Sequence, residues 1–477
     1  MNTLPLELIL DLCTHLTVPD IAHCCAVSHS WRSIFNNNNL WKRYCHKDLD
    51  EYLRTTPCVV EPKFVIPEVR SSRLDPICEW RLAYMRQNHL WNNWRTGNFK
   101  KQIVISNPSN DLNFHADIFM DYLALIYEER IELWDINVVP ARKLSVSYHY
   151  IPSYVLKSFK CGGKNWDIIV LNYLSGTQVF RMNEATKIIE MKHIFYFEED
   201  EKPLVYTDEH IKGMFSYQHM YPVPSIAILG SIYVGVIKGN SNNLHVWDLE
   251  TGVKLREEPC LKSNPYSFIE ISSSSTSEDI IVVTSQVCGG VIKRMPDTLP
   301  GESLDVLDYH FNVYSPRLLT FLPFSKTHLS SRGYGCAIHK NYVAINVGNE
   351  LSILNYVTSQ VVYSSTLFLT GLDVIDNGIV FVLGSIFHLY NPSVKPRVRM
   401  SENVVYFKTV CGNFLLFRKD EIGFPTELWE AGMIVRRTRT ELPKSDTIRS
   451  NRSCTKLVIK DYIMPNERML VNILYFW

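Results

Sequence analysis

From residue 101 onward the sequence repeats one local pattern, in which two β-rich runs are separated by a short polar turn. The two clearest copies, residues 122–136 and 232–255, contain the pairs Trp134-Asp135 and Trp247-Asp248 at the end of their second run. Five weaker copies lack this pair and lie at 168–182, 280–295, 342–356, 379–391 and 412–432. Because aromatic and β-branched side chains suit a half-buried pleated surface, the pattern predicts a series of β-hairpins and argues against a large helical bundle.

These hairpins resemble the blades of WD-repeat propellers, in which a Trp-Asp pair marks the end of the third strand. Seven hairpins favour seven blades, enlarged by polar insertions such as 272–279 and 198–201. A repeat length of about 40–45 residues would instead place eight or nine blades in residues 101–477, so eight blades is the alternative. The apolar run at 469–477 is predicted to be a strand that completes or closes the ring, which would leave no sheet edge exposed there.

The first 45 residues have helical spacing instead. Leucines recur every four residues and fall on one face of a short helix: Leu4, Leu8, Leu12 and Leu16. Pro5 suits the first turn of that helix. A second helix is predicted to begin at Pro19, and a third after Ser28, broken by the asparagines at 36–39. Three short helices cannot hide this many large apolar side chains among themselves, so the surplus must be buried against the rest of the chain or against a partner.

This segment resembles an F-box, because its landmarks occur in the expected order: a Leu-Pro opening, the leucines, an Asp-Ile start of the second helix, Val-Ser, Trp-Arg and a closing Leu-Trp. The resemblance implies docking onto a Skp-type adaptor, which links F-box proteins to a cullin scaffold and its RING subunit, through a helix-in-groove contact. The matching positions are Leu4, Pro5, Glu7, Leu8, Leu12, Leu16, Ile21, Val27, Trp31, Leu40 and Trp41. Which of them contact the adaptor and which fill the core of the box is left open.

Residues 46–100 are predicted to be a helical connector. Asp75-Pro76 matches an N-cap followed by proline at the first helical position. The end of the helix resembles the NWxxG element of F-box proteins with WD-repeat propellers, matched here by Asn93, Trp94 and Gly97, and an ordinary amphipathic helix ending at a glycine is the alternative. The predicted fold is therefore α+β and multidomain: an F-box at 1–45, the connector at 46–100 and an all-β propeller at 101–477.

Charge and cysteine content bear on partners and compartment. Lysine plus arginine and aspartate plus glutamate both number 49, so the formal net charge is zero and neither nucleic acid nor membrane is predicted as a partner. No apolar run of about 18 residues predicts a membrane span, and the N-terminus lacks the basic region of a signal peptide. The twelve cysteines contain no CxxC pair and are predicted to be reduced thiols in a cytoplasmic or nuclear protein.

No catalytic signature is present: GxxxxGK[ST], HExxH and GxSxG do not occur, and histidines and cysteines do not cluster at metal-ligand spacing. No catalytic residue, metal or cofactor is therefore predicted. One basic cluster within 436–456 contains Arg436, Arg437 and Arg439. Arginines on a propeller rim would bind a phosphorylated or acidic client, because a guanidinium pairs bidentately with phosphate, and a solvated loop is the alternative.

The resemblance implies a non-catalytic substrate-recognition subunit of an SCF-type (Skp–cullin–F-box) E3 ubiquitin ligase, in which the F-box docks to the adaptor and the propeller binds a protein client for ubiquitination. A non-degradative scaffold for protein assembly or trafficking is the alternative. A propeller enzyme with an axial active site is a third class, and the missing acid/base or metal constellation argues against it.

Overall fold

The computed structural model describes residues 5–13, 15–45, 47–66, 77–106, 114–119, 122–127, 130–148, 158–162, 168–173, 176–183, 185–196, 225–236, 243–259, 268–274, 276–287, 307–330, 334–367, 369–375, 378–383, 386–391, 398–401, 404–410, 413–418, 426–430, 436–440, 447–451, 453–463 and 468–477. Two compact units emerge, one of residues 1–106 with 438–477 and one of residues 107–437. The predicted boundaries 1–45, 46–100 and 101–477 stay a prediction.

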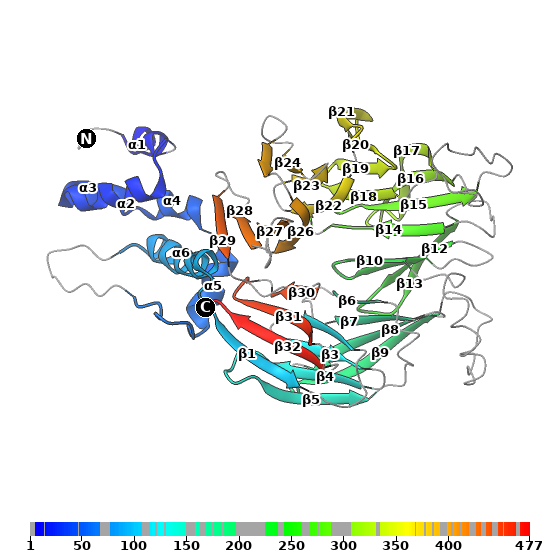
Figure 1. The fold of residues 1–477 in the computed structure, drawn as a ribbon, viewed down its shortest axis with the longest axis horizontal. Coiled ribbons are helices and arrows are strands. Elements are labelled where there is room, and N and C mark those ends of the chain that lie inside the picture. The colour runs from blue at the N-terminus through cyan, green and yellow to red at the C-terminus, as the bar shows by residue number, and fades with distance from the viewer. Residues whose placement is uncertain are drawn as a thin grey trace. The chain divides into compact units, whose positions relative to one another are not determined.

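Helices occupy the first hundred residues, as the spacing predicts (Figure 1). Their bounds are α1 (Leu6–Leu12), α2 (Val18–Val27), α3 (His29–Phe35), α4 (Asn38–Trp41), η1 (Lys42–Tyr44), α5 (Lys47–Thr55) and α6 (Glu79–Thr96). The predicted cap Asp75-Pro76 lies outside the described residues, and α6 follows Cys78 directly.

Strands that are consecutive in the chain form four-stranded sheets from His115 to Thr440. The first three sheets are β2 (His115–Phe119), β3 (Tyr122–Ile126), β4 (Arg130–Asp135), β5 (Arg142–Tyr148); β6 (Ser158–Gly162), β7 (Ile168–Tyr173), β8 (Gly176–Asn183), β9 (Ile188–Tyr196); and β10 (Ser225–Leu229), β11 (Ile232–Val236), β12 (Asn243–Asp248), β13 (Lys254–Pro259). The next four are β14 (Phe268–Ser272), β15 (Ile280–Val287), β16 (Leu307–Ser315), β17 (Thr320–Ser330); β18 (Tyr334–His339), β19 (Tyr342–Val347), β20 (Glu350–Asn355), β21 (Gln360–Ser365); β22 (Leu369–Ile375), β23 (Gly378–Leu383), β24 (Ile386–Tyr390), β25 (Val398–Ser401); and β26 (Val404–Val410), β27 (Asn413–Arg418), β28 (Thr426–Glu430), β29 (Arg436–Thr440).

One further sheet joins the first strand of the chain to the last three. Its order is β1 (Lys100–Ser106), β32 (Arg468–Tyr475), β31 (Lys456–Ile463) and β30 (Thr447–Ser450), and we call it the terminal sheet. β32 pairs antiparallel with β1 on one side and β31 on the other, so neither of its edges is free (Figure 1). The strand predicted at 469–477 is therefore confirmed, and it completes a sheet.

The described residues thus form eight four-stranded sheets, one more than the favoured count of seven blades and as many as the alternative of eight. Six of the seven predicted hairpins are the second and third strands of successive sheets. In the hairpin predicted at 280–295 the second run lies outside the described residues, and β15 pairs with β16 instead. The eighth sheet was missed because its strands come from opposite ends of the sequence and leave no local repeat.

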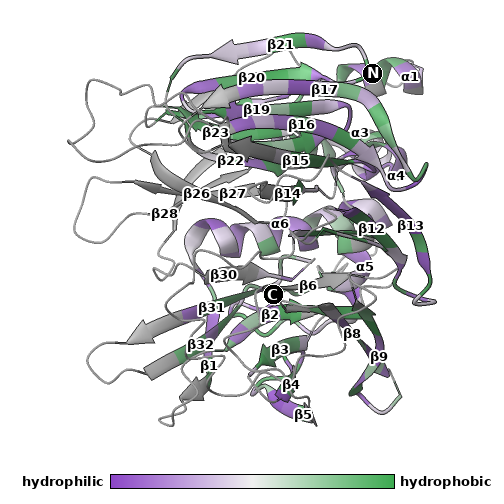
Figure 2. Ribbon diagram, turned by 90° about the vertical axis from the view of Figure 1, so that its right-hand side faces the viewer, coloured by the Kyte–Doolittle hydropathy of each residue, from purple (hydrophilic) through white to green (hydrophobic). Residues whose placement is uncertain are grey.

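Successive sheets share buried cores. Between the first two sheets, Leu133 and Ala124 pack with Ile169, Leu171 and Phe180, and equivalent clusters join each later pair as far as the sheet β22–β25. Three strands of the sheet β18–β21 are labelled in Figure 2, where β20 lies beyond β19 and β21 beyond β20. Four-stranded sheets packed in chain order are the construction of a β-propeller, and the predicted fold class is confirmed.

Candidate functional site

The leading helices are fixed by local capping signals. Thr17 caps α2 through a capping box: its hydroxyl accepts from the Asp20 N–H at 3.4 Å, and the Asp20 carboxylate accepts from the Thr17 N–H at 3.0 Å. Ser28 Oγ accepts from the Trp31 N–H at 3.2 Å, which starts α3 where the sequence predicts it. Pro5 occupies the N-cap position of α1.

Some of the residues that match the F-box fill the core between these helices. Ile21, Leu40 and Trp41 are at most 1 % exposed and pack with the core side chains Ile9, Cys13, Cys25 and Phe35. The indole N–H of Trp41 donates to the Phe35 carbonyl at 2.8 Å, so its polar atom is also satisfied internally. A side chain without accessible surface cannot contact a second protein. Of the two roles that the sequence left open, these three residues therefore take the core role.

A different part of the set is uncovered. Leu8 is 51 % exposed and Leu12 is 46 % exposed, and they lie one turn apart on α1, so both occupy the same helix face. Val27, at the end of α2, is 63 % exposed. We call Leu8, Leu12 and Val27 the uncovered apolar residues. The rest of the predicted set divides as follows: Pro5 and Glu7 are exposed, Leu16 and Trp31 are half-buried, and Leu4 lies outside the described residues.

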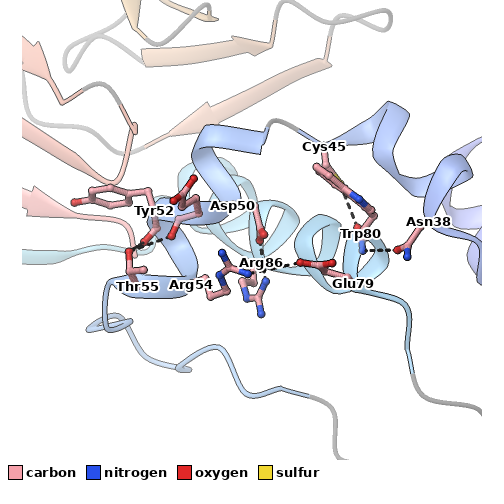
Figure 3. A network of polar contacts seen from close by, with 10 residues as sticks. Asn38, Cys45, Asp50, Tyr52, Arg54, Thr55, Glu79, Trp80 and Arg86 are labelled. Atoms are coloured by element: carbon pink, nitrogen blue, oxygen red, sulfur yellow. Dashed lines mark hydrogen bonds and ion pairs between the residues drawn. The ribbon is translucent and has the colours of Figure 1, made fainter. Parts of the chain in front are cut away.

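Two asparagines of the run 36–39, which ends α3, also cap the start of α6. Asn36 Oδ1 accepts from the Cys78 N–H at 3.0 Å. Asn38 Oδ1 accepts from the Trp80 N–H at 3.1 Å, a contact drawn in Figure 3. The first backbone N–H groups of a helix have no partner within the helix, so these amides cap α6 from a segment about forty positions earlier in the chain. Sequence reasoning missed this role because the cap and its helix are not adjacent in sequence.

The connector is held together by polar contacts around α6. Arg86 Nη1 donates to Asp50 Oδ1 on α5 at 2.8 Å, and both side chains are almost completely buried (Figure 3). Cys45 Sγ donates to the Trp80 carbonyl at 3.3 Å. Burial, and then the nearby Asp50 carboxylate, raise the pKa of Cys45 to about 12, so its thiol stays protonated and serves in packing.

The last turn of α6 explains why an NWxxG element stands here. Asn93 Nδ2 donates to the Phe476 carbonyl at 2.9 Å, and Trp94 Nε1 donates to the Cys454 carbonyl at 2.8 Å. The Trp94 ring stacks on Phe476 with 3.8 Å between centroids. Gly97 ends the helix at a φ of +66°, a left-handed conformation that glycine adopts without a Cβ penalty. The three residues therefore tie the connector to the segments that flank β31 and β32.

α5 contributes to the same junction. Lys456, a buried member of the basic cluster, donates through Nζ to the Tyr52 hydroxyl at 2.8 Å. The indole N–H of Trp477 donates to the Thr56 carbonyl at 2.8 Å. Lys456, at the start of β31, thus has a structural role in holding α5 of the connector, and its ammonium is already bound.

Both Trp-Asp pairs end the third strand of their sheet, at β4 and β12, which is the position that the WD resemblance implies. Asp248 Oδ1 accepts from the N–H groups of Glu250 and Thr251 at 2.9 and 2.8 Å and so fixes the turn before β13. Asp135 Oδ1 accepts from the Asn137 N–H at 2.8 Å in the same way. Trp247 is 4 % exposed, whereas Trp134 is half-buried. The pairs serve the architecture of the sheet.

His245, which stacks on Trp247 at 5.3 Å, should make the protein less stable in mild acid. Burial, and then the Lys254 ammonium, lower the pKa of His245 to about 4, against the opposing effect of Glu257. Between pH of about 6.5 and 4 the unfolded chain takes up a proton that the folded chain does not, so stability falls as pH falls, by at most about 1.4 kcal/mol per pH unit. Denaturant unfolding of wild type and His245→Phe across this range should give a steeper loss in wild type. Parallel curves would contradict the assignment.

The remaining predicted positions are less informative. Arg436, Arg437 and Arg439 lie on β29, and their side chains are outside the described residues. Among the described residues no group of His, Cys, Asp or Glu has the arrangement of a metal site, and no helix is long and apolar enough to cross a membrane.

Seven described cysteines are free, as predicted, but Cys454 is disulfide-bonded, so the prediction of reduced thiols fails there.

Comparisons with known proteins fit this organisation. The family model described as "F-box-like" matches residues 1–47. The F-box/WD repeat-containing protein 7 of Drosophila melanogaster is 31 % identical over 107 residues, which are 22 % of this chain and only 8 % of that protein.

Similar solved structures include the computationally designed Ika8 protein (12 % identity, 78 % of this chain and 99 % of that chain, TM-score 0.45) and the Dos1 propeller (9 % identity, 74 % of this chain and 75 % of that chain, TM-score 0.36). Both TM-scores are below 0.5, so the propeller assignment rests on the sheets themselves. The chain therefore carries an F-box-like domain at its N-terminus, is similar over 107 residues to an F-box/WD repeat protein, and continues as a propeller of four-stranded sheets.

Proposed function

We propose that this protein is the substrate-recognition subunit of an SCF-type E3 ubiquitin ligase. Its F-box would bind a Skp-type adaptor, and through it a cullin and a RING subunit, while its propeller would bind a protein client. The subunit itself would be non-catalytic: proximity of client lysines to the charged ubiquitin-conjugating enzyme would supply the rate enhancement. The proposal places the protein in the cytoplasm, the nucleus or both.

The observation that supports the proposal best is the pair of exposed leucines on α1. Ile9 and Cys13, on the other side of the same helix, are 4 % and 1 % exposed, so the helix has a filled face and an uncovered one. Burying apolar surface is worth about 25 cal/mol per Å², and a helix that leaves two leucines half in water gains that energy only by binding another surface. A groove that accepts an apolar helix face meets this need.

The connector supports a role in presenting the client. One helix, α6, is capped by the F-box asparagines at its start and bonded to the flanks of β31 and β32 at its end. The buried Arg86–Asp50 pair braces its middle against α5. A bound adaptor would therefore be connected to the terminal sheet through a packed element, which suits a receptor that must hold its client at a fixed distance.

Depletion and rescue would test the proposed function. Proteins bound by the intact chain are identified, and their half-lives are measured in depleted cells that express wild type, Leu8→Asp/Leu12→Asp or the surface control Leu318→Asp, an exposed leucine between β16 and β17. We expect the clients to be stabilised by depletion and destabilised again by wild type and by the control, but not by the double variant. Unchanged half-lives together with lost assemblies would refute the ligase role in favour of the scaffold.

The arginines of β29 give a separate prediction about the client. If Arg436, Arg437 and Arg439 bind a phosphorylated or acidic peptide, charge reversal at all three should weaken client capture by at least tenfold, because each guanidinium–phosphate pair is a charge-assisted contact worth about 1.5–3 kcal/mol. Capture from lysate before and after phosphatase treatment measures this. Adaptor binding by the same variant serves as the control, and undiminished client capture would show that the cluster is a solvated strand.

A further inference from the structure

The outer edge of the sheet β18–β21 differs from the other sheet edges. Its first strand, β18, packs against β14 and β22 of the neighbouring sheets, whereas β21 pairs with β20 and, in the described part of the chain, with no further strand. Figure 2 shows β21 beyond β20 at the outside of this sheet. Such an edge strand presents backbone N–H and C=O groups that can pair with another strand.

Charge normally protects such edges, and here it is missing. The fourth strand of every other sheet between His115 and Thr440 carries at least one charged residue, and both edges of the terminal sheet carry basic residues. These protecting residues include Arg142 of β5, Glu190 of β9, Lys254 of β13, Lys326 of β17, Arg399 of β25, Arg436 of β29, Lys100 of β1 and Arg449 of β30. β21, with the sequence QVVYSS, has none.

The edge is apolar as well as uncharged. Val361 is 54 % exposed, and Val362, the extra residue at the bulge of the strand, is 37 % exposed. Val357 before the strand and Leu367 after it are 66 % and 52 % exposed. β-branched residues on an open edge favour addition of a strand, because each pairing buries side chains as well as backbone groups.

We propose that β21 pairs antiparallel with β21 of a second copy of this chain, so that two sheets become one continuous sheet across a two-fold axis. The charge pattern selects this occupant. Pairing with any other outer edge among the described sheets would place the valines beside ionised groups, and within that set a second β21 is the one neutral, β-branched edge. An interface that uses the same patch on both copies is closed and yields a dimer rather than a fibre.

Sedimentation velocity of the intact chain over a concentration series tests the proposal. We expect a monomer–dimer equilibrium in wild type and an increase of at least tenfold in the dissociation constant for Val361→Lys, because a lysine on an edge strand opposes the addition of a second strand. The matched control is Leu255→Lys on β13, a residue 40 % exposed on an already charged edge, which should dimerise as wild type does. Val361→Thr, which keeps the strand neutral and β-branched, should also dimerise.

Circular dichroism confirms that the variants fold. Wild type that stays monomeric throughout the series would overturn the proposal, and so would Val361→Lys and Leu255→Lys dissociation constants that do not differ. If wild type is monomeric but Val361→Lys loses a captured protein, the edge binds a different chain and self-pairing is equally refuted. Adaptor binding plays no part in this equilibrium, so failure here leaves the proposed ligase function untouched.

Discussion

Replacing Leu8 and Leu12 together by alanine should weaken binding of a Skp-type adaptor by roughly 30- to 1000-fold. The range corresponds to about 2–4 kcal/mol, the usual loss when a central apolar anchor of an interface is truncated. Both side chains are about half exposed in the free chain, so their removal takes surface from the partner contact and little from the F-box core. Calorimetric titration of the intact protein with purified adaptor measures the effect.

Two controls separate docking from folding. Leu318→Ala makes the same truncation at a leucine that is also exposed, at 66 %, on another surface, and it should bind adaptor as wild type does. Ile9→Ala, on the buried side of α1, should lower the free energy of unfolding by about 2–5 kcal/mol, as core truncations do. Wild-type affinity in the double variant would mean that the adaptor uses a different face of the helices.

Trp94→Ala should destabilise the unit that contains the connector and the terminal sheet by about 3–5 kcal/mol, the cost of truncating a fully buried tryptophan. Trp94 is 1 % exposed and stacks on Phe476, and its indole N–H satisfies the Cys454 carbonyl. The variant leaves a cavity between α6 and the strand flanks and an acceptor without a donor. Denaturant unfolding followed by tryptophan fluorescence and by circular dichroism measures the loss.

Two further variants test the hydrogen bond of Trp94 and the importance of its position on α6. Trp94→Phe keeps an aromatic ring against Phe476 and loses the hydrogen bond, so it should cost about 1 kcal/mol. Trp91→Ala truncates a half-buried tryptophan three positions earlier on the same helix and should cost clearly less than Trp94→Ala. Equal losses at positions 91 and 94 would show that the junction with Phe476 contributes nothing specific to stability.

Most of the correct predictions from the sequence depend on residues that lie close together in the chain. The cap at Ser28, the ends of β4 and β12 at Trp-Asp pairs and six of the hairpins depend on residues close together in the chain. The split within the F-box set could not be predicted in this way. Leu8 and Ile9 are adjacent and equally apolar, and only packing against α2 and α3 determines that Ile9 is buried while Leu8 is exposed.

The sequence by itself determined the kind of protein: short helices with F-box landmarks, then repeated hairpins, because periodicity and capping act over a few residues. Tertiary structure alone decided the eighth sheet, the capping of α6 by Asn36 and Asn38, and the contacts of Asn93 and Trp94 with the flanks of the last strands. These contacts join segments about forty to nearly four hundred positions apart. No local pattern encodes such pairs, since they form only when the rest of the chain has brought their partners together.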